Sequence, residues 1–216
     1  EFVEKIRPTL QRPAGAEGWF AIPHGQKIAT TYGEAVEKVL VAVSSKRKFK
    51  NYREGELGPD RLRQCFRTVN MLNELGKQQA GDILILPVQY GLRHRGRSVR
   101  RARECFLANE FGLGAFVLGC MALVHLERYV RWEELDTDCA GDEYAPDADG
   151  DFSSAPILYF YDDRLEFVTN WFVNAFDFYG SVSAFLPKSL LRGRRHPQGC
   201  LLSTSMRNAT TRRAFG

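Results

Sequence analysis

The sequence lacks the short motifs that mark many enzymes. Its 216 residues contain no GxSxG, GxGxxG or GxxxxGKS/T pattern, so neither a serine nucleophile elbow nor a glycine-rich phosphate loop is indicated. No two of its four histidines lie within one helical turn of each other, so they predict no metal-binding pair. These absences make an enzyme uncertain and favour a binding or assembly protein, because the groups that catalysis needs show no recognisable spacing.

Closely spaced cysteines and long apolar runs are also missing. The five cysteines include no CxxC pair, which argues against a zinc ribbon or a disulfide-stapled secreted scaffold and predicts reduced thiols in a cytoplasmic protein. The longest uncharged run, residues 111–126, has 16 residues, whereas a membrane helix needs about 20. We therefore expect a buried core segment there and no membrane partner. The chain begins at Glu1 rather than Met, which suggests a processed or trimmed N-terminus.

Charge is divided unevenly along the chain, although the net charge is only +4. Residues 131–166 contain twelve acidic and two basic residues, whereas the segments before and after them are both basic. Such asymmetry concerns partners and association rather than fold. The charged segments are therefore the first places to look for function.

Composition and patterning predict an α+β fold, with three to four helices packed on a small mixed β-sheet. Hydrophobic residues make up 44% and charged residues 26%, close to the average of globular proteins. We expect an N-terminal arm over residues 1–16, a single domain over residues 17–187 and a basic tail over residues 188–216. Within that domain, residues 133–155 lack apolar periodicity and predict a long acidic loop.

Local signals predict individual elements. Thr31 and Glu34 form a capping-box pattern that begins one helix, and Ser98 begins another. Apolar spacings of three and four predict further helices over residues 59–76, 111–130 and 171–179. Strands are expected over residues 18–23, 82–88 and 181–186, and a β-hairpin over residues 156–168.

The first candidate site is the segment from Leu92 to Arg103, which contains six arginines. Arginine can hold phosphate through two parallel hydrogen bonds, and the N-terminus of the helix expected at Ser98 would add backbone donors. The arginines repel one another unless nucleic acid, an acidic protein or the chain's own acidic loop lies near them. The predicted phosphate-binding residues, with a second basic cluster included, are Arg93, Arg95, Arg97, Ser98, Arg100, Arg101, Lys46, Arg47 and Lys48.

The second candidate is the acidic segment 136–151. Asp147, Asp149 and Asp151 alternate as at the start of a calcium loop, but the EF-hand pattern fails at its later Gly and Glu positions. A Mg²⁺ site needs only one or two carboxylates plus substrate phosphates, and Asp138, Asp142 and Asp147 could supply them. The alternative is a hydrated acidic loop without a divalent cation.

Aromatic residues are concentrated near the C-terminal end of the expected domain. Ten of the 26 aromatic residues lie between Tyr159 and Phe185. We expect most of them in the core, because buried rings dominate core energetics. Rings that stay exposed would be able to stack on nucleic-acid bases.

Three functions remain open at this point. The first is a non-enzymatic protein that binds nucleic acid or another anionic partner through the arginine-rich junction. The second is a metal-dependent phosphoesterase or nuclease that uses the Asp-rich loop. The third is an assembly subunit, a homo-oligomer in which the basic and acidic segments of different copies pair.

Overall fold

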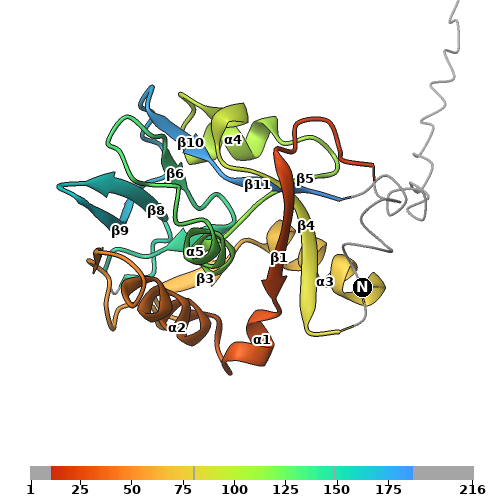
Figure 1. Ribbon diagram of the computed structural model, residues 1–216, viewed down its shortest axis with the longest axis horizontal. Coiled ribbons are helices and arrows are strands. Elements are labelled where there is room, and N and C mark those ends of the chain that lie inside the picture. Colours follow the sequence, from red (N-terminus) through yellow and green to blue (C-terminus); the bar gives the residue numbers. More distant parts are fainter. Residues whose placement is uncertain (1–10, 80, 148, 187–216) are drawn as a thin grey trace, which may run out of the picture.

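The computed structural model describes residues 11–79, 81–147 and 149–186. This part of the chain contains five α-helices and two β-sheets, so the predicted α+β class is confirmed (Figure 1). The expected basic tail, residues 188–216, and residues 1–10 of the expected arm lie outside the described residues.

The smaller sheet has four strands in the order β1–β4–β11–β5, and all its neighbours are antiparallel. Strand β4 lies inside this sheet between β1 and β11, and its residues from Leu86 to Gln89 are buried. A continuous apolar run suits such an interior strand. The strands are β1 (Gly18–Pro23), β4 (Ile83–Gln89), β5 (Glu110–Gly112) and β11 (Ser183–Phe185).

The larger sheet has seven strands, in the order β10–β6–β8–β7–β3, with β9 paired to both β8 and β2. The predicted hairpin is present as β8 and β9, and Asp162 and Asp163 form its turn with φ of 49° and 61°. Two positive φ values in succession are typical of a tight type I′ hairpin turn. The strands are β2 (Phe49–Asn51), β3 (Leu62–Gln64), β6 (Asp136–Asp138), β7 (Asp142–Tyr144), β8 (Ser154–Tyr161), β9 (Arg164–Trp171) and β10 (Tyr179–Ser181).

Helix α5 lies at the centre of the molecule, between α2 and the two sheets (Figure 1). Eight of its ten residues, from Ala115 to Ala122, are buried, so it is apolar on all sides, as a core helix must be. One hydrophobic cluster joins α5 to both sheets, through Leu86 on one side and Leu158 on the other. The helices are α1 (Gly25–Ile28), α2 (Tyr32–Ser44), α3 (Phe66–Gln78), α4 (Val99–Cys105) and α5 (Ala115–Val124), with a 3₁₀ turn, η3, at Leu92–His94.

The local capping signals are confirmed. Thr31 accepts a hydrogen bond from the Glu34 amide, and the Glu34 carboxylate accepts one from the Thr31 amide, so the capping box that begins α2 is complete. Ser98 caps α4 by accepting a hydrogen bond from the Arg101 amide. Strand β1 occupies the predicted residues 18–23.

Three expected helices are wrong in part or whole. Residues 62–64 form strand β3, so α3 begins only at Phe66, whose side chain is 82% exposed rather than inward-facing. Residues 110–112 form strand β5, and α5 ends at Val124 rather than at residue 130. Residues 171–179 form the end of β9, a series of turns and the start of β10, because strand pairing with distant residues overrides the helical spacing of the aromatics.

The expected acidic loop at residues 133–155 is also corrected, because it contains strands β6 and β7 and the start of β8. Strand β6 pairs with β8 and β10, and β7 pairs with β3 and β8, so much of this acidic segment lies inside a sheet. Within the described ranges, no helix has the length and apolar character needed to cross a bilayer.

Candidate functional site

The six arginines of residues 92–103 do not form one uniform surface. Three of them pair with carboxylates of the same chain: Arg93 with Glu110 at 3.1 Å, Arg101 with Glu104 at 2.8 Å and Arg103 with Glu143 at 3.6 Å. Arg103 also donates to the carbonyl oxygens of Ala140 and Asp142. Two of the five arginines predicted in this segment to bind an anion, Arg93 and Arg101, therefore already have a carboxylate partner in the chain, as does Arg103.

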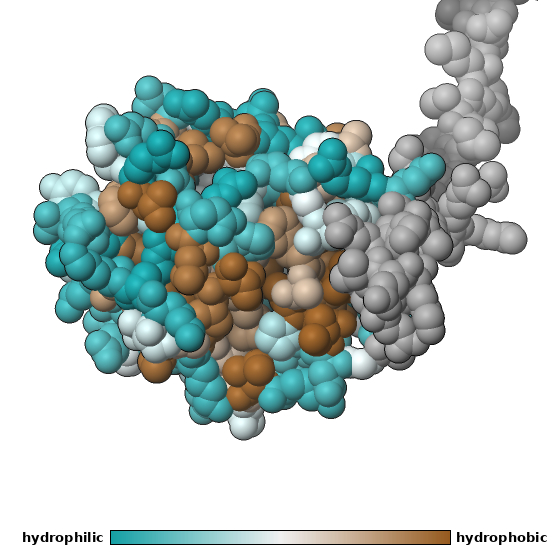
Figure 2. Space-filling view, in the orientation of Figure 1, coloured by the Kyte–Doolittle hydropathy of each residue, from teal (hydrophilic) through white to brown (hydrophobic). Residues whose placement is uncertain are grey.

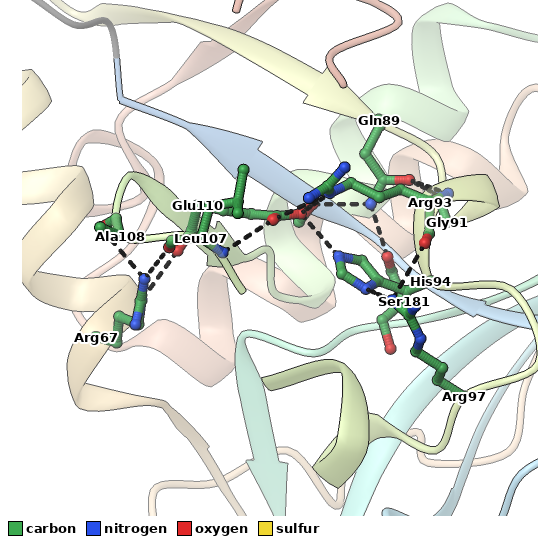
Figure 3. Close-up of polar contacts among 11 residues, drawn as sticks. Arg67, Gln89, Gly91, Arg93, His94, Arg97, Leu107, Ala108, Glu110 and Ser181 are labelled. Carbon is green, nitrogen blue, oxygen red and sulfur yellow. Dashed lines mark hydrogen bonds and ion pairs between the residues drawn. The ribbon is translucent and has the colours of Figure 1, made fainter. Parts of the chain in front are cut away.

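Arg93 belongs to a buried polar network around Glu110 (Figure 3). The Glu110 side chain is fully buried and accepts hydrogen bonds from His94 Nε2 at 2.7 Å and from Ser183 Oγ at 2.7 Å. Arg93 Nε and the Leu107 amide donate to its other oxygen, at 3.1 and 3.2 Å. Burial alone would raise the pKa of Glu110, but hydrogen bonds led by those of His94 and Ser183 lower it to about 2.

The outer ends of this network are also occupied. Gln89 donates to Ser183 Oγ at 2.8 Å, and its own amide oxygen accepts from the Gly91 amide at 2.7 Å. Arg97 Nη1 lies 3.1 Å from His94 Nδ1, and because arginine can only donate, His94 accepts at Nδ1 and carries its proton on Nε2. Ser183 donates to Glu110 rather than to His94, so these three side chains form a structural network and not a nucleophilic triad.

The helix N-terminus at Ser98 offers little to a phosphate group. The Arg101 amide donates to Ser98 Oγ at 3.2 Å, and the Arg100 amide donates to the Phe172 carbonyl oxygen at 2.9 Å. Two of the backbone donors expected to hold an anion therefore have protein acceptors, and Ser98 itself is buried. Helix α4 has only seven residues, which also limits its dipole.

The other three arginines, Arg95, Arg97 and Arg100, are exposed and form no ion pair with any described residue. Their segment lies beside residues 171–178, which comprise the end of β9 and the turns that connect it to β10, shown next to α4 in Figure 1. Arg95 Nε donates to the Asp177 carbonyl oxygen at 2.7 Å, and the Gly96 amide donates to that of Tyr179 at 2.9 Å. With the bond from Arg100 to Phe172, three hydrogen bonds hold these distant segments together.

Several aromatic rings in residues 171–178 are exposed, contrary to the expected core role. Trp171 is 51% exposed, Phe176 42% and Phe178 48%. The rings of Phe176 and Phe178 are stacked, with centroids 5.5 Å apart. Figure 2 shows hydrophobic areas among hydrophilic ones over this end of the molecule, near α4. We call the six side chains the arginine–aromatic surface: Arg95, Arg97, Arg100, Trp171, Phe176 and Phe178.

The second predicted basic cluster lies elsewhere. Lys46, Arg47 and Lys48 follow the C-terminus of α2, which Figure 1 shows at the opposite end of the molecule from α4. Arg47 donates to the carbonyl oxygens of Arg128 and Tyr129, and Lys48 pairs with Asp163. The two basic clusters therefore do not form one surface, and Lys46 alone of these three lacks a side-chain partner among the described residues.

The three predicted metal ligands are not gathered together. Asp142 is buried and accepts from the Ala115 amide at 2.6 Å and from the Tyr32 hydroxyl at 2.8 Å, so it caps the N-terminus of α5. Residue 114 must be glycine there, because a Cβ would lie 2.1 Å from an Asp142 oxygen. Asp147 is exposed, and no group of three or more Cys, His, Asp or Glu suited to a metal ion occurs within the described residues.

Asp138 has the least usual environment of the three. Its side chain is 3% exposed, and its Oδ2 atom has no hydrogen-bond partner in the part of the chain that the structure describes. Ser181, the residue aligned with it on β10, is fully buried and also has an unpartnered hydroxyl. Burial raises the pKa of Asp138 to about 8, with a further contribution from Asp136, while burial raises the pKa of Asp136 to about 7.

Sequence reasoning did not select Gln89, Glu110 or Ser183. The available signal was weak, since Glu110 directly precedes the apolar run at Phe111 and Gln89 ends the apolar run of β4. A polar residue at the border of such a run is more often solvated than buried. Only the pairing of β11 with β4 and β5 brings these side chains together.

The fold and this site define a mixed α+β protein with a polar network inside and an arginine–aromatic surface outside. Comparison of the chain with known protein families, curated proteins and solved structures finds no match.

Proposed function

We propose that the protein binds single-stranded nucleic acid through the arginine–aromatic surface, without enzymatic activity. Proteins that bind single strands combine cationic side chains, which follow the phosphates, with exposed rings on which bases stack. Arg95, Arg97 and Arg100 supply the cations, and Trp171 supplies the largest of the three exposed rings in this surface. We also propose that the protein is cytoplasmic, as its unpaired cysteine spacing predicts. Cell fractionation tests this location.

One observation carries this proposal: the hydrogen bonds that fix the arginine segment against residues 171–178. They connect Arg95 to Asp177, Gly96 to Tyr179 and Arg100 to Phe172, so the segment that carries the three arginines lies against the segment that carries the three exposed rings. A fixed arrangement loses less conformational entropy on binding than separate flexible chains would. Asp177 is the only acidic residue between positions 167 and 186, and the facing segment carries three arginines without an ion pair to any described residue.

Local charge matters here because residues 1–186 taken together are not basic. Residues 187–216 contain seven of the basic residues and no acidic ones, which leaves residues 1–186 with a net charge of −3. General attraction between this part of the chain and a polyanion is therefore weak. Binding should depend on the three arginines, and their removal should have a large effect.

Fluorescence anisotropy with a fluorescein-labelled single-stranded oligonucleotide tests the proposal. Three phosphate contacts contribute about −2 to the log–log salt slope, and Arg100→Gln should reduce its magnitude by about 0.7. Trp171→Ala should weaken binding by about 1–3 kcal/mol through lost stacking. Lys46→Gln removes the same charge at the opposite end of the molecule and should leave binding unchanged.

Two further measurements separate the proposal from its alternatives. A duplex of the same sequence should bind less tightly, because its bases are already stacked, and polyglutamate should not bind comparably, because it offers no bases. An absence of oligonucleotide binding at low salt would overturn the proposal. If light scattering then showed concentration-dependent oligomers that dissociate in salt, the self-association hypothesis would replace it.

A further inference from the structure

A pocket of about 860 Å³ lies away from the arginine–aromatic surface. Its walls come from the end of β1 and α1, from residues 29–32, from α3 and from the first turn of α5. Helix α3 contributes Val69, Leu72, Asn73 and Gly76, whose spacing of three and four places them on one helical face. This volume is in the range of pockets that hold small organic ligands.

Two amide side chains and one imidazole line this pocket. His24, Gln64 and Asn70 are half-buried, and none of the three side chains forms a hydrogen bond with a described residue. Asparagine and glutamine present one donor and one acceptor side by side, so they pair with a ligand edge of the same kind. Such side chains at a concave surface are available to a ligand without breaking an existing contact.

The pocket offers no free charge from its walls. Glu74 and Lys77 are its charged residues, and they pair with each other at 2.8 Å. A charged ligand would lose hydration without gaining an opposite charge, which disfavours it. Ile22, Leu84 and Phe116 add apolar lining on which a flat, uncharged ring could pack.

We propose that this pocket binds a small uncharged heterocycle with adjacent donor and acceptor groups, of the size of a purine nucleoside. A purine edge of this kind is what an Asn or Gln amide recognises with two hydrogen bonds. Asn70 and Gln64 supply the amides, and His24 supplies a third polar contact. This site is independent of the proposed nucleic-acid surface.

Gly76 provides a sensitive way to test the pocket. A Cβ at this position would lie 3.1 Å from His24 Cε1, so Gly76→Ala displaces the imidazole and narrows the space. The residue lies within helix α3 and is not among the glycines with positive φ, so alanine suits its backbone and favours the helix. The substitution therefore disturbs the pocket without unfolding the protein.

Isothermal titration calorimetry with adenosine as the probe measures binding, and AMP serves as the charged counterpart. Adenosine should bind, AMP should bind at least about tenfold more weakly, and Asn70→Ala should weaken adenosine binding about tenfold. Gly76→Ala should weaken it as well. Gln78→Ala removes an exposed amide from the same helix outside the pocket and should have no effect.

The outcomes separate this inference from the proposed function. Circular dichroism should first show that the Asn70→Ala and Gly76→Ala variants are folded. If adenosine binding then survived both substitutions, the proposed binding site in this pocket would be wrong. Tighter binding of AMP than of adenosine, or no binding by any of the four common ribonucleosides, would also overturn it. Arg100→Gln and Trp171→Ala should leave adenosine binding unchanged, whereas a loss in those variants would place the nucleoside on the arginine–aromatic surface.

Discussion

Two buried carboxyl groups, Glu110 and Asp138, have opposite environments. Glu110 is fully buried and accepts hydrogen bonds from the side chains of His94, Ser183 and Arg93 and from the Leu107 amide. Asp138 is 3% exposed, and its Oδ2 atom has no partner among the described residues. Both residues lie on short strands, β5 and β6, so the difference comes from what surrounds each strand.

The comparison shows that hydrogen bonds decide which charge state a buried carboxyl group adopts. The donors around Glu110 outweigh burial and lower its pKa to about 2, so the carboxylate is the stable form. Burial and neighbouring Asp136 raise the pKa of Asp138 to about 8, although the Arg103 charge opposes them. At neutral pH Glu110 is therefore charged, and Asp138 is mostly neutral.

The two groups also make stability depend on pH in opposite directions. The fold lowers the pKa of Glu110, so the Glu110 carboxylate stabilises the folded state above about pH 4.5. This stabilisation is lost as the pH falls towards 2. The fold raises the pKa of Asp138, so the contribution of its protonated form to stability is complete below about pH 3.8. That contribution declines as the pH rises towards 8. Asp136 and Asp142, with pKa values raised to about 7, act in the same direction as Asp138.

Removal of the Glu110 carboxylate should have the largest effect. Glu110→Ala leaves His94, Ser183 and Arg93 without their acceptor, so we expect a loss of about 3–5 kcal/mol in the free energy of unfolding. Glu110→Gln keeps one acceptor oxygen and should cost less. Urea denaturation at neutral pH measures both, and a loss below about 1 kcal/mol for the alanine variant would show that the network contributes little.

Replacement of Asp138 should have the opposite sign. Asp138→Asn removes the cost of ionising a buried group, so near pH 9 the variant should be more stable than the parent by about 2–4 kcal/mol. Near pH 4 the two proteins should differ by less than about 1 kcal/mol, because Asp138 is then protonated in the folded state and roughly half protonated in the unfolded state. Asp147→Asn, at an exposed position, is the control. An equal effect at both pH values would mean that ionisation of Asp138 is not the cause.

The sequence predicted best those elements that depend on neighbouring residues. The capping box of Thr31 and Glu34 and the hairpin turn at Asp162 need only local contacts, and both are present. Strand β3 pairs with β7 across about eighty residues, with Leu62 aligned to Tyr144, and no local pattern specifies such a partner. The predicted helix over residues 59–76 therefore began too early, in residues that a distant strand holds extended.

The candidate site was predictable only in outline. The arginine segment was visible as composition, but which of its arginines pair with a carboxylate depends on Glu110, Glu104 and Glu143 in the folded chain. The acidic segment predicted a hydrated surface, whereas Asp138 and Asp142 are buried. Hydrophilic composition indicates exposure on average, and it fails where a buried carboxyl group caps a helix or remains unpartnered.

A pair of serines gives the finest test of the comparison. Ser181 and Ser183 are two residues apart and both fully buried, so their truncation to alanine removes the same atom from similar surroundings. Ser183 Oγ donates to Glu110 and accepts from Gln89, so Ser183→Ala should cost about 1–2 kcal/mol in the free energy of unfolding.

Ser181 has an unpartnered hydroxyl aligned with Asp138, so Ser181→Ala should cost less than about 0.5 kcal/mol or stabilise the fold. Urea denaturation of both variants near pH 5, where Asp138 is protonated, measures the difference. If Ser181→Ala cost as much stability as Ser183→Ala, the Ser181 hydroxyl would have a hydrogen-bond partner after all. The first candidate for that partner is Asp138, which is aligned with Ser181 across the two strands. The contrast between the two carboxyl groups would then be one of degree rather than of kind.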